Sequence, residues 1–92
     1  MGIPEERIER LLPLAREAIV AGEHDRARTY VRRAKRIAER SRARLPREFE
    51  RKTCSDCDVY LRPGVTARVR TRASRVVVRC LECGATHRYP FS

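Results

Sequence analysis

Two Cys-x-x-Cys pairs limit what this chain can fold into more than any other feature. The first pair, Cys54 and Cys57, lies in "RKTCSDCDVYLRPG", and the second, Cys80 and Cys83, lies in "VVVRCLECGATHRYP". Two residues between thiols allow a tight turn that aims both sulfurs at one ion. Two such knuckles, brought together by a hairpin, complete a tetrahedral shell of four thiolates. The spacing therefore predicts a zinc ribbon whose metal ligands are Cys54, Cys57, Cys80 and Cys83.

A closed shell of four thiolates has no open position for water or substrate, so the expected single Zn²⁺ is structural. Such binding contributes about 10 to 16 kcal/mol to the folding of small zinc modules. Gly84 suits a knuckle that needs a positive φ. Iron in the same shell stays open as an alternative, whereas a thioredoxin-like redox pair would need only one Cys-x-x-Cys. We expect His87 to be a surface histidine of the ribbon, because four cysteines already complete the shell.

A metal staple is needed because the chain is short and poor in large apolar residues. Its 92 residues include two phenylalanines, three tyrosines and no tryptophan, too little for a deep core. The sequence contains no serine, histidine and carboxylate arrangement, no paired catalytic acids and no glycine-rich phosphate loop. We therefore expect no catalytic residues and no small-molecule substrate.

The charge balance indicates a nucleic-acid partner. Basic residues number 22 against 12 acidic residues, and all of the basic residues except Lys35 and Lys52 are arginine. Arginine binds phosphate bidentately and stacks on bases, although a GC-rich or heat-adapted source could also enrich it. No apolar run approaches the roughly 18 residues of a membrane span, and no signal-peptide pattern opens the chain. We expect a cytoplasmic protein with no membrane partner.

The first half of the sequence predicts an antiparallel hairpin of two helices. Apolar residues recur at helical spacing over about residues 4 to 21, with a kink or break at Pro13 and a stop at Gly22. A second helix starts near Asp25 and ends before Pro46. The aliphatic residues exceed what two short helices can bury against each other, which indicates a protein-binding surface. Its predicted members are Ile8, Leu11, Leu12, Ile19, Tyr30, Val31 and Ile37.

The second half predicts a short antiparallel sheet. From Tyr60 the period changes to two, Val76 to Val78 form a further strand, and Pro63-Gly64 marks a turn. By this alternation Val65, Ala67 and Val69 face the core, whereas Thr66 and the neighbouring arginines face outward. The expected fold class is small α+β, divided into a helical hairpin (1–45), a basic connector (46–53) and a zinc ribbon with rubredoxin-like knuckles (54–92).

The outward arginines predict an RNA-binding surface. A rigid row of arginines can contact the phosphates of structured RNA and recognise shape more than sequence. A merely solvated face is the alternative, as is RNA contact through the basic connector. The predicted RNA-binding residues are Arg62, Arg68, Arg70, Arg72, Arg75 and Arg79 in the ribbon, and Arg47, Arg51 and Lys52 in the connector.

Beyond spacing, the run "RLPREFERKTCSDCDVYLRPGVTARVR", followed by "VVVRCLECGATHRYPF", resembles the zinc-ribbon subunit family of archaeal ribonuclease P, protein component 4, which is shared with the eukaryotic enzyme. The upstream "RIERLLPLAREA" and "ARTYVRRAKRIAER" resemble that family's two N-terminal helices. The resemblance extends from about Arg7 to Phe91. It includes the hairpin, the Leu-Pro-Arg connector and the ribbon, and is therefore more specific than a match to a four-cysteine motif alone.

The resemblance implies a noncatalytic subunit of the ribonucleoprotein that removes the 5′ leader from precursor tRNA, with catalysis carried by the RNA subunit. It implies ribonuclease P RNA and precursor tRNA as RNA partners. It also implies a protein partner, the barrel-shaped component 1, held by the N-terminal helices. Two other function classes stay open: a nucleic-acid-binding ribbon of the transcription or translation machinery, and a protein-interaction adaptor.

Overall fold

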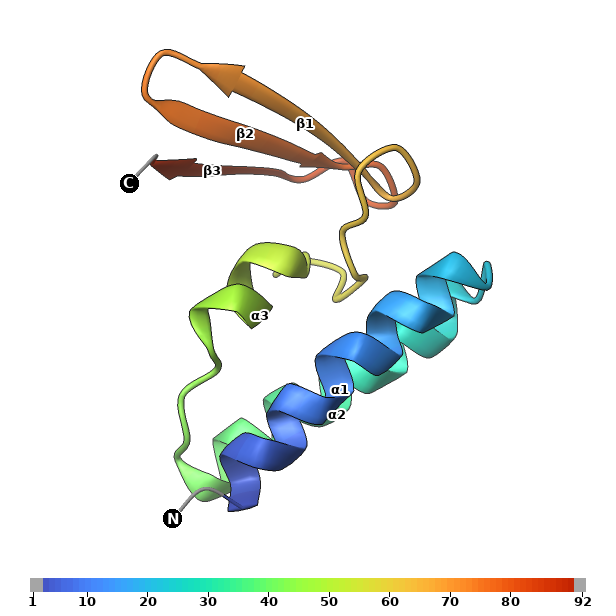
Figure 1. Ribbon diagram of the computed structural model, residues 1–92, viewed down its shortest axis with the longest axis vertical. Coiled ribbons are helices and arrows are strands. Elements are labelled where there is room, and N and C mark those ends of the chain that lie inside the picture. The colour runs from blue at the N-terminus through green and yellow to red at the C-terminus, as the bar shows by residue number, and fades with distance from the viewer. Residues whose placement is uncertain (1–2, 91–92) are drawn as a thin grey trace.

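The computed structural model describes residues 3–90 and has the predicted small α+β architecture. Two long helices lie side by side, a three-stranded antiparallel sheet lies beyond one of their ends, and a short helix lies between (Figure 1). Within residues 3–90, no helix is both long and apolar enough to cross a membrane. In chain order the elements are α1 (Ile3–Val20), α2 (His24–Ser41), α3 (Arg47–Lys52), β1 (Ala67–Arg72), β2 (Arg75–Cys80) and β3 (Thr86–Pro90).

The turn between α1 and α2 closes the predicted hairpin at Gly22. Gly22 has φ +80°, a backbone conformation that glycine adopts without steric cost. Its N–H bonds the Ile19 carbonyl at 3.0 Å, and the Glu23 N–H bonds the Ala18 carbonyl at 2.8 Å. These two bonds form a Schellman motif, which satisfies carbonyls at the end of α1 and lets α2 begin at once.

The predicted break at Pro13 does not occur, because α1 continues through this residue. Proline at this position removes one backbone donor, which alone would weaken the helix. Buried side chains anchor α1 on both sides of it, Ile8 and Leu11 before and Ala15 and Ile19 after. Packing against α2 thus offsets the local cost of the proline.

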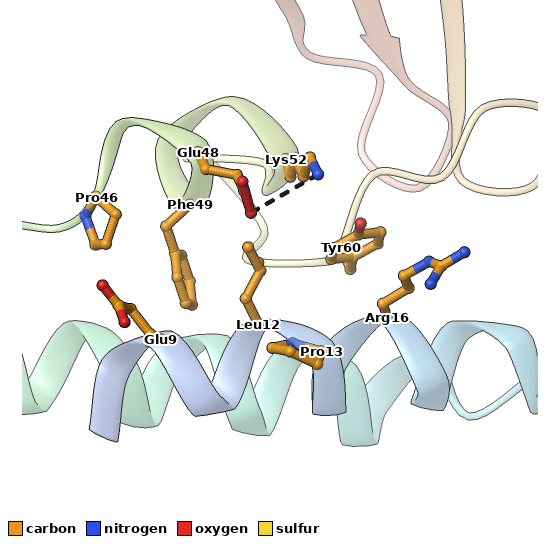
Figure 2. Close-up of a pocket in the computed structure, with 9 residues that line it drawn as sticks. All are labelled: Glu9, Leu12, Pro13, Arg16, Pro46, Glu48, Phe49, Lys52 and Tyr60. Carbon is orange, nitrogen blue, oxygen red and sulfur yellow. Dashed lines mark ion pairs between the residues drawn. The ribbon is translucent and has the colours of Figure 1, made fainter. Parts of the chain in front are cut away.

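Helix α3 lies within the segment that the sequence predicted to be a basic connector. Its one apolar residue, Phe49, is buried between α3 and α1 beside Leu12 and Tyr60 (Figure 2). Thr53 follows the last residue of the helix, and its hydroxyl donates to the Phe49 carbonyl at 2.7 Å. Phe49 therefore joins the hairpin and the ribbon into one continuous buried core.

The aliphatic residues predicted to bind a protein partner do not form an exposed surface. The two helices bury them against each other, and Phe49 and Tyr60 cover part of the remaining edge. Among the hairpin residues whose burial the structure describes, the exposed large apolar ones are instead Leu14 and Val20. The prediction that these residues form an exposed surface is wrong. The structure buries Ile8, Leu11, Leu12, Ile19 and Val31, and partly buries Tyr30 and Ile37.

The sheet has strand order β1-β2-β3 and two chemically different faces. In an antiparallel pair, directly opposed residues project from the same face. Val69 is opposite Val78, and Val78 is opposite His87, which defines one face. On that face Tyr89 reaches α3, where its hydroxyl donates to the Glu50 carbonyl at 3.4 Å. The other face carries the arginines described below.

The alternation predicted for residues 65 to 69 is wrong at its start, because β1 begins only at Ala67. Val65 lies in the preceding turn and is exposed, whereas Thr66 is fully buried. The Thr66 hydroxyl accepts the Arg62 N–H at 2.8 Å and donates to the Tyr60 carbonyl at 2.6 Å. Val69 does face away from the arginines but is 44% exposed, so it borders the core rather than filling it.

Replacing Thr66 with valine should destabilise the ribbon by about 1 to 3 kcal/mol, since it leaves a buried backbone donor and acceptor without their partner. The change keeps the branched shape, so lost packing contributes little. Chemical denaturation of the metal-loaded protein measures the effect. Thr71→Val, at an exposed position of β1, is the control. Equal stability of the two variants would show that the buried hydroxyl contributes nothing.

Candidate metal centre and arginine face

Four thiols converge at the end of the sheet nearest α2. All four sulfurs lie within 4.8 Å of one another, with 3.6 Å between Cys54 Sγ and Cys83 Sγ and 3.6 Å between Cys57 Sγ and Cys80 Sγ. A tetrahedral shell with metal–sulfur bonds of about 2.3 Å requires sulfur separations of about 3.8 Å. The spacing matches that requirement, so the cluster fits one tetrahedral metal ion.

The two knuckles share the same backbone hydrogen bonds. Cys54 N–H bonds the Val59 carbonyl and Cys80 N–H bonds the Ala85 carbonyl, at 2.9 and 2.8 Å. The residue after the second cysteine closes each turn, Asp58 to Cys54 and Gly84 to Cys80. Both closing residues have positive φ, +66° and +82°. The prediction for Gly84 is confirmed, and Asp58 occupies the equivalent position as a residue type that tolerates this conformation.

The thiols differ in their electrostatic surroundings. Burial raises the pKa of the Cys54 thiol to about 12 and raises that of Cys80 as well. A backbone hydrogen bond from Ala85 lowers the pKa of the exposed Cys83. Thiolates are the metal-binding form, so an ion must displace protons from the two buried cysteines. A divalent cation supplies the positive charge that makes this favourable.

His87 lies closer to the cluster than the sequence predicted. Its Nε2 is 3.4 Å from Cys54 Sγ, and the side chain is partly buried. Pairing of β3 with β2 places His87 opposite Val78, on the face of the sheet from which Cys80 also projects. The four cysteines remain the candidate ligand set, with His87 as a neighbour that can hydrogen-bond to Cys54 Sγ.

Helix α2 binds both knuckles through ion pairs that the sequence analysis missed. Glu82, between Cys80 and Cys83, forms an ion pair with Arg28 at 2.8 Å, and His24 Nδ1 lies 3.3 Å from the same carboxylate oxygen. The hydrogen bond from Arg28 lowers the pKa of the Glu82 carboxyl. Asp58 pairs with Arg32 at 3.1 Å and with Lys35. The sequence did contain a signal for these contacts, because each knuckle carries an acidic residue and the second helix is rich in basic residues.

Glu82→Gln should loosen the second knuckle from α2 and destabilise the protein by about 1 kcal/mol, as expected for a partly exposed pair. The loss should be smaller at high salt, which screens the pair in the unmodified protein. Denaturation at low and high salt measures both effects. Glu39→Gln is the control, since Glu39 is exposed on the same helix that Glu82 contacts. An identical response of the two variants would contradict a role for the pair.

The predicted arginine row lies on one face of the sheet. Arg68 is opposite Arg79, and Arg72 is opposite Arg75, so two strands contribute to the same face. Arg70 is opposite Val77, which is opposite Arg88 of β3. Shallow grooves run between these side chains, one of about 200 Å³. The sequence analysis missed Arg88, although the period of two in "THRYP" offered a signal.

The other predicted RNA-binding residues lie elsewhere. Arg47, Arg51 and Lys52 belong to α3, and Arg62 precedes the Pro63-Gly64 turn. Arg51 lies over the Tyr89 ring, 5.5 Å from its centroid. These residues are therefore separate from the arginine face, which consists of Arg68, Arg70, Arg72, Arg75, Arg79 and Arg88.

Comparison with known proteins gives concordant matches over nearly the whole chain. Residues 7–84 match the family model described as RNAse P Rpr2/Rpp21/SNM1 subunit domain. "Ribonuclease P protein component 4" of Halobacterium salinarum is 57% identical over 98% of this chain and 96% of the relative. The protein of the same name from Methanopyrus kandleri is 52% identical over 94% of this chain and 69% of the relative.

Two solved structures share the fold. A chain of the "cryo-EM structure of archaeal Ribonuclease P with mature tRNA" is 43% identical, has a TM-score of 0.90, and is matched over 97% of this chain and 77% of its own length. The structure described as "Pfu Rpp21 structure and assignments" is 36% identical with a TM-score of 0.66, over 94% of this chain and 97% of the other.

Proposed function

The chain belongs to the RNAse P Rpr2/Rpp21/SNM1 subunit family, and from this premise we propose that it is a noncatalytic protein subunit of ribonuclease P. The enzyme would remove the 5′ leader of precursor tRNA, with catalysis by the RNA subunit. The observation that carries the proposal is the match, at a TM-score of 0.90, to a chain of an archaeal ribonuclease P bound to mature tRNA. A closed four-cysteine cluster, which offers no open coordination position, agrees with a noncatalytic role.

The metal of the cluster is proposed to be one structural Zn²⁺. Four thiolates in tetrahedral spacing suit zinc, and a ribbon with so small a core depends on the ion for its stability. When bound, the ion supplies the cross-link between the two knuckles. The same knuckles position β1 and β2, because Cys80 is the last residue of β2 and is opposite Ala67, the first of β1.

The RNA partners are proposed to be ribonuclease P RNA and precursor tRNA, contacted mainly by the arginine face. Six arginines from three strands lie on this face. Of the six, none forms an ion pair with an acidic residue within the described part of the chain. Guanidinium groups without an acidic partner are available for phosphate. Their separation along a twisted sheet suits the curved backbone of folded RNA.

The protein partner is proposed to be the barrel-shaped component 1, held by the helical hairpin. Because the aliphatic residues predicted to bind a partner are buried or partly buried, the contact would use the outward side chains of the two helices. The exposed Leu14 and Val20 supply apolar anchors on α1. An interface of this kind, a few apolar anchors within a polar rim, is common among stable complexes.

Reconstitution tests the proposed function. The chain is mixed with its cognate ribonuclease P RNA and the other protein subunits, and cleavage of precursor tRNA is assayed with and without it. We expect 5′ leader removal to need less RNA or less Mg²⁺ when the chain is present, and the chain alone to leave precursor tRNA intact. Unchanged cleavage in its presence, with no association with the RNA, would contradict the proposal.

A further inference from the structure

A second basic site lies on the face of the sheet opposite the arginine face. A groove of about 380 Å³ runs between α1, α3, the Pro63-Gly64 turn and the sheet. Four cations from separate parts of the chain line it: Arg16 of α1, Arg51 and Lys52 of α3, and Arg62 before the turn. Cations from separate elements around one concavity focus positive potential there.

The floor of this groove is apolar. Val69 projects into it from β1 and remains 44% exposed, and the nearly buried Val78 and Leu61 lie beside it. Val69 is therefore an apolar side chain at the border of the core that stays open to solvent among basic residues. Apolar floors with a few charged groups around the rim are typical of sites for ligands that are flat and apolar in one part and charged in another.

The cations of the rim are available for a ligand. Among the described residues, Arg16, Arg51 and Arg62 form no ion pair, and Lys52 pairs with Glu48 only at 3.8 Å, where both side chains are well exposed. Tyr89 restrains Arg51 through a cation–π contact of 5.5 Å. Figure 2 shows Arg16 beside Tyr60, directed away from Glu9 along α1. The groove thus has four cations on its rim, and one of them, Arg51, is held in place by an aromatic ring.

We propose that this groove binds one unpaired nucleotide of an RNA strand, with the base against Val69 and the flanking phosphates on Arg16, Arg51, Lys52 and Arg62. A base in a helix cannot reach such a floor, whereas a bulged or loop base can leave the stack and pack on apolar side chains and guanidinium planes. Four cations exceed what a single base requires, so a sugar-phosphate backbone is the occupant that matches the rim charge. The inference rests on the proposed RNA-binding function and adds a site selective for single-stranded segments.

Two RNA probes test the groove on the full-length, metal-loaded chain: a hairpin RNA with a single bulged nucleotide, and the same hairpin fully paired. Arg16→Ala should weaken binding of the bulged RNA by about three- to fivefold, the range for exposed charge contacts, and leave the paired RNA nearly unaffected. Arg10→Ala, at another exposed position of α1, is the matched control and should change neither affinity. Equal effects of the two variants would overturn the proposal.

Methyl resonances give a second, direct measure of the contact. The Val69 methyls should shift through the ring current of the base when bulged RNA is added, and should shift much less with paired RNA. Val77, on the arginine face, is the internal reference and should respond similarly to both RNAs. A shift of Val77 with no shift of Val69 would overturn the groove while leaving RNA binding by the other face intact.

Two further outcomes separate this inference from its alternatives. Val69 shifts produced by an oligoglutamate peptide, but not by bulged RNA, would assign the groove to an acidic protein segment and overturn the nucleotide site. Failure of the unmodified chain to bind either RNA would overturn the proposed function together with the groove. Binding of both RNAs with Arg16→Ala indistinguishable from the unmodified chain would overturn the groove alone.

Discussion

Cys54→Ser should unfold the ribbon while leaving part of the helical circular-dichroism signal. Loss of a buried thiolate would open the proposed four-cysteine shell, and the metal ion of comparable zinc modules supplies about 10 to 16 kcal/mol. The total stability of a domain of this size is only about 5 to 15 kcal/mol, so little remains without the ion. The hairpin retains its own buried contacts between α1 and α2. Metal content and far-ultraviolet circular dichroism, measured on the same samples, check this result.

Ser55→Ala is the control for this experiment, since it alters an exposed residue of the same knuckle and keeps all four thiols. It should bind one ion per chain and retain the full signal. Addition of a strong chelator to the unmodified protein should reproduce the effect of Cys54→Ser, and Zn²⁺ should reverse it. A metal content near zero in a chain whose ribbon is still folded would contradict the account.

The double variant Arg68→Ala, Arg70→Ala should bind RNA roughly tenfold more weakly at physiological salt, because two exposed phosphate contacts of up to about 1 kcal/mol each are lost. It should also raise the concentration of the chain needed to support precursor-tRNA cleavage. Both side chains are exposed on β1, so metal content and stability should not change. Affinity measured by fluorescence anisotropy, together with the cleavage assay, checks the prediction.

The matched control is Arg33→Ala, Arg36→Ala, which removes the same charge from exposed positions of α2. A long-range charge effect would weaken RNA binding equally in both double variants. The arginine face predicts a larger loss for the β1 variant. If instead only variants at Arg47, Arg51 and Lys52 reduced affinity, the RNA contact would lie on α3 and its groove.

The sequence alone predicted the convergence of four cysteines, the hairpin and the two strands that carry most of the arginines. These features depend on local rules, namely thiol spacing, glycine at positive φ, and the periods of helix and strand. Gly22 and Gly84 illustrate this, because one follows a helical pattern and the other a Cys-x-x-Cys turn, and both positions need a positive φ. The alternation of β1 likewise placed Arg68, Arg70 and Arg72 on a common face.

The features that the sequence did not predict depend on contacts between distant segments. The segment Arg47–Lys52 forms helix α3 because its Phe49 is buried against α1 and Tyr60. This packing stabilises a helix of six residues, which would not be stable by itself. Thr66 is buried because the Pro63-Gly64 turn folds it inward, one residue before the strand period begins. The ion pairs of Asp58 and Glu82 with α2 similarly join residues far apart in the chain.

The same long-range packing explains why the predicted exposed surface of aliphatic residues on the hairpin is wrong. The two helices carry more apolar residues than they can bury against each other, which indicated an exposed surface. The sequence did not show that α3 and Tyr60 would cover Leu12. A short helix with one large apolar residue was sufficient to bury that edge. Helical periodicity alone is therefore not enough to infer a protein-binding surface, because other segments of the chain can pack against the hairpin.

The salt dependence of RNA binding tests most directly the claim that a metal-held sheet presents its arginine face to RNA. Each phosphate contact adds about 0.7 to 0.9 to the slope of log affinity against log salt concentration. The Arg68, Arg70 double variant, fully metal-loaded, should therefore flatten this slope by about 1.4 to 1.8, and the Arg33, Arg36 variant should not. An unchanged slope and unchanged affinity in the β1 variant would contradict the claim and leave the arginine face as a solvated surface.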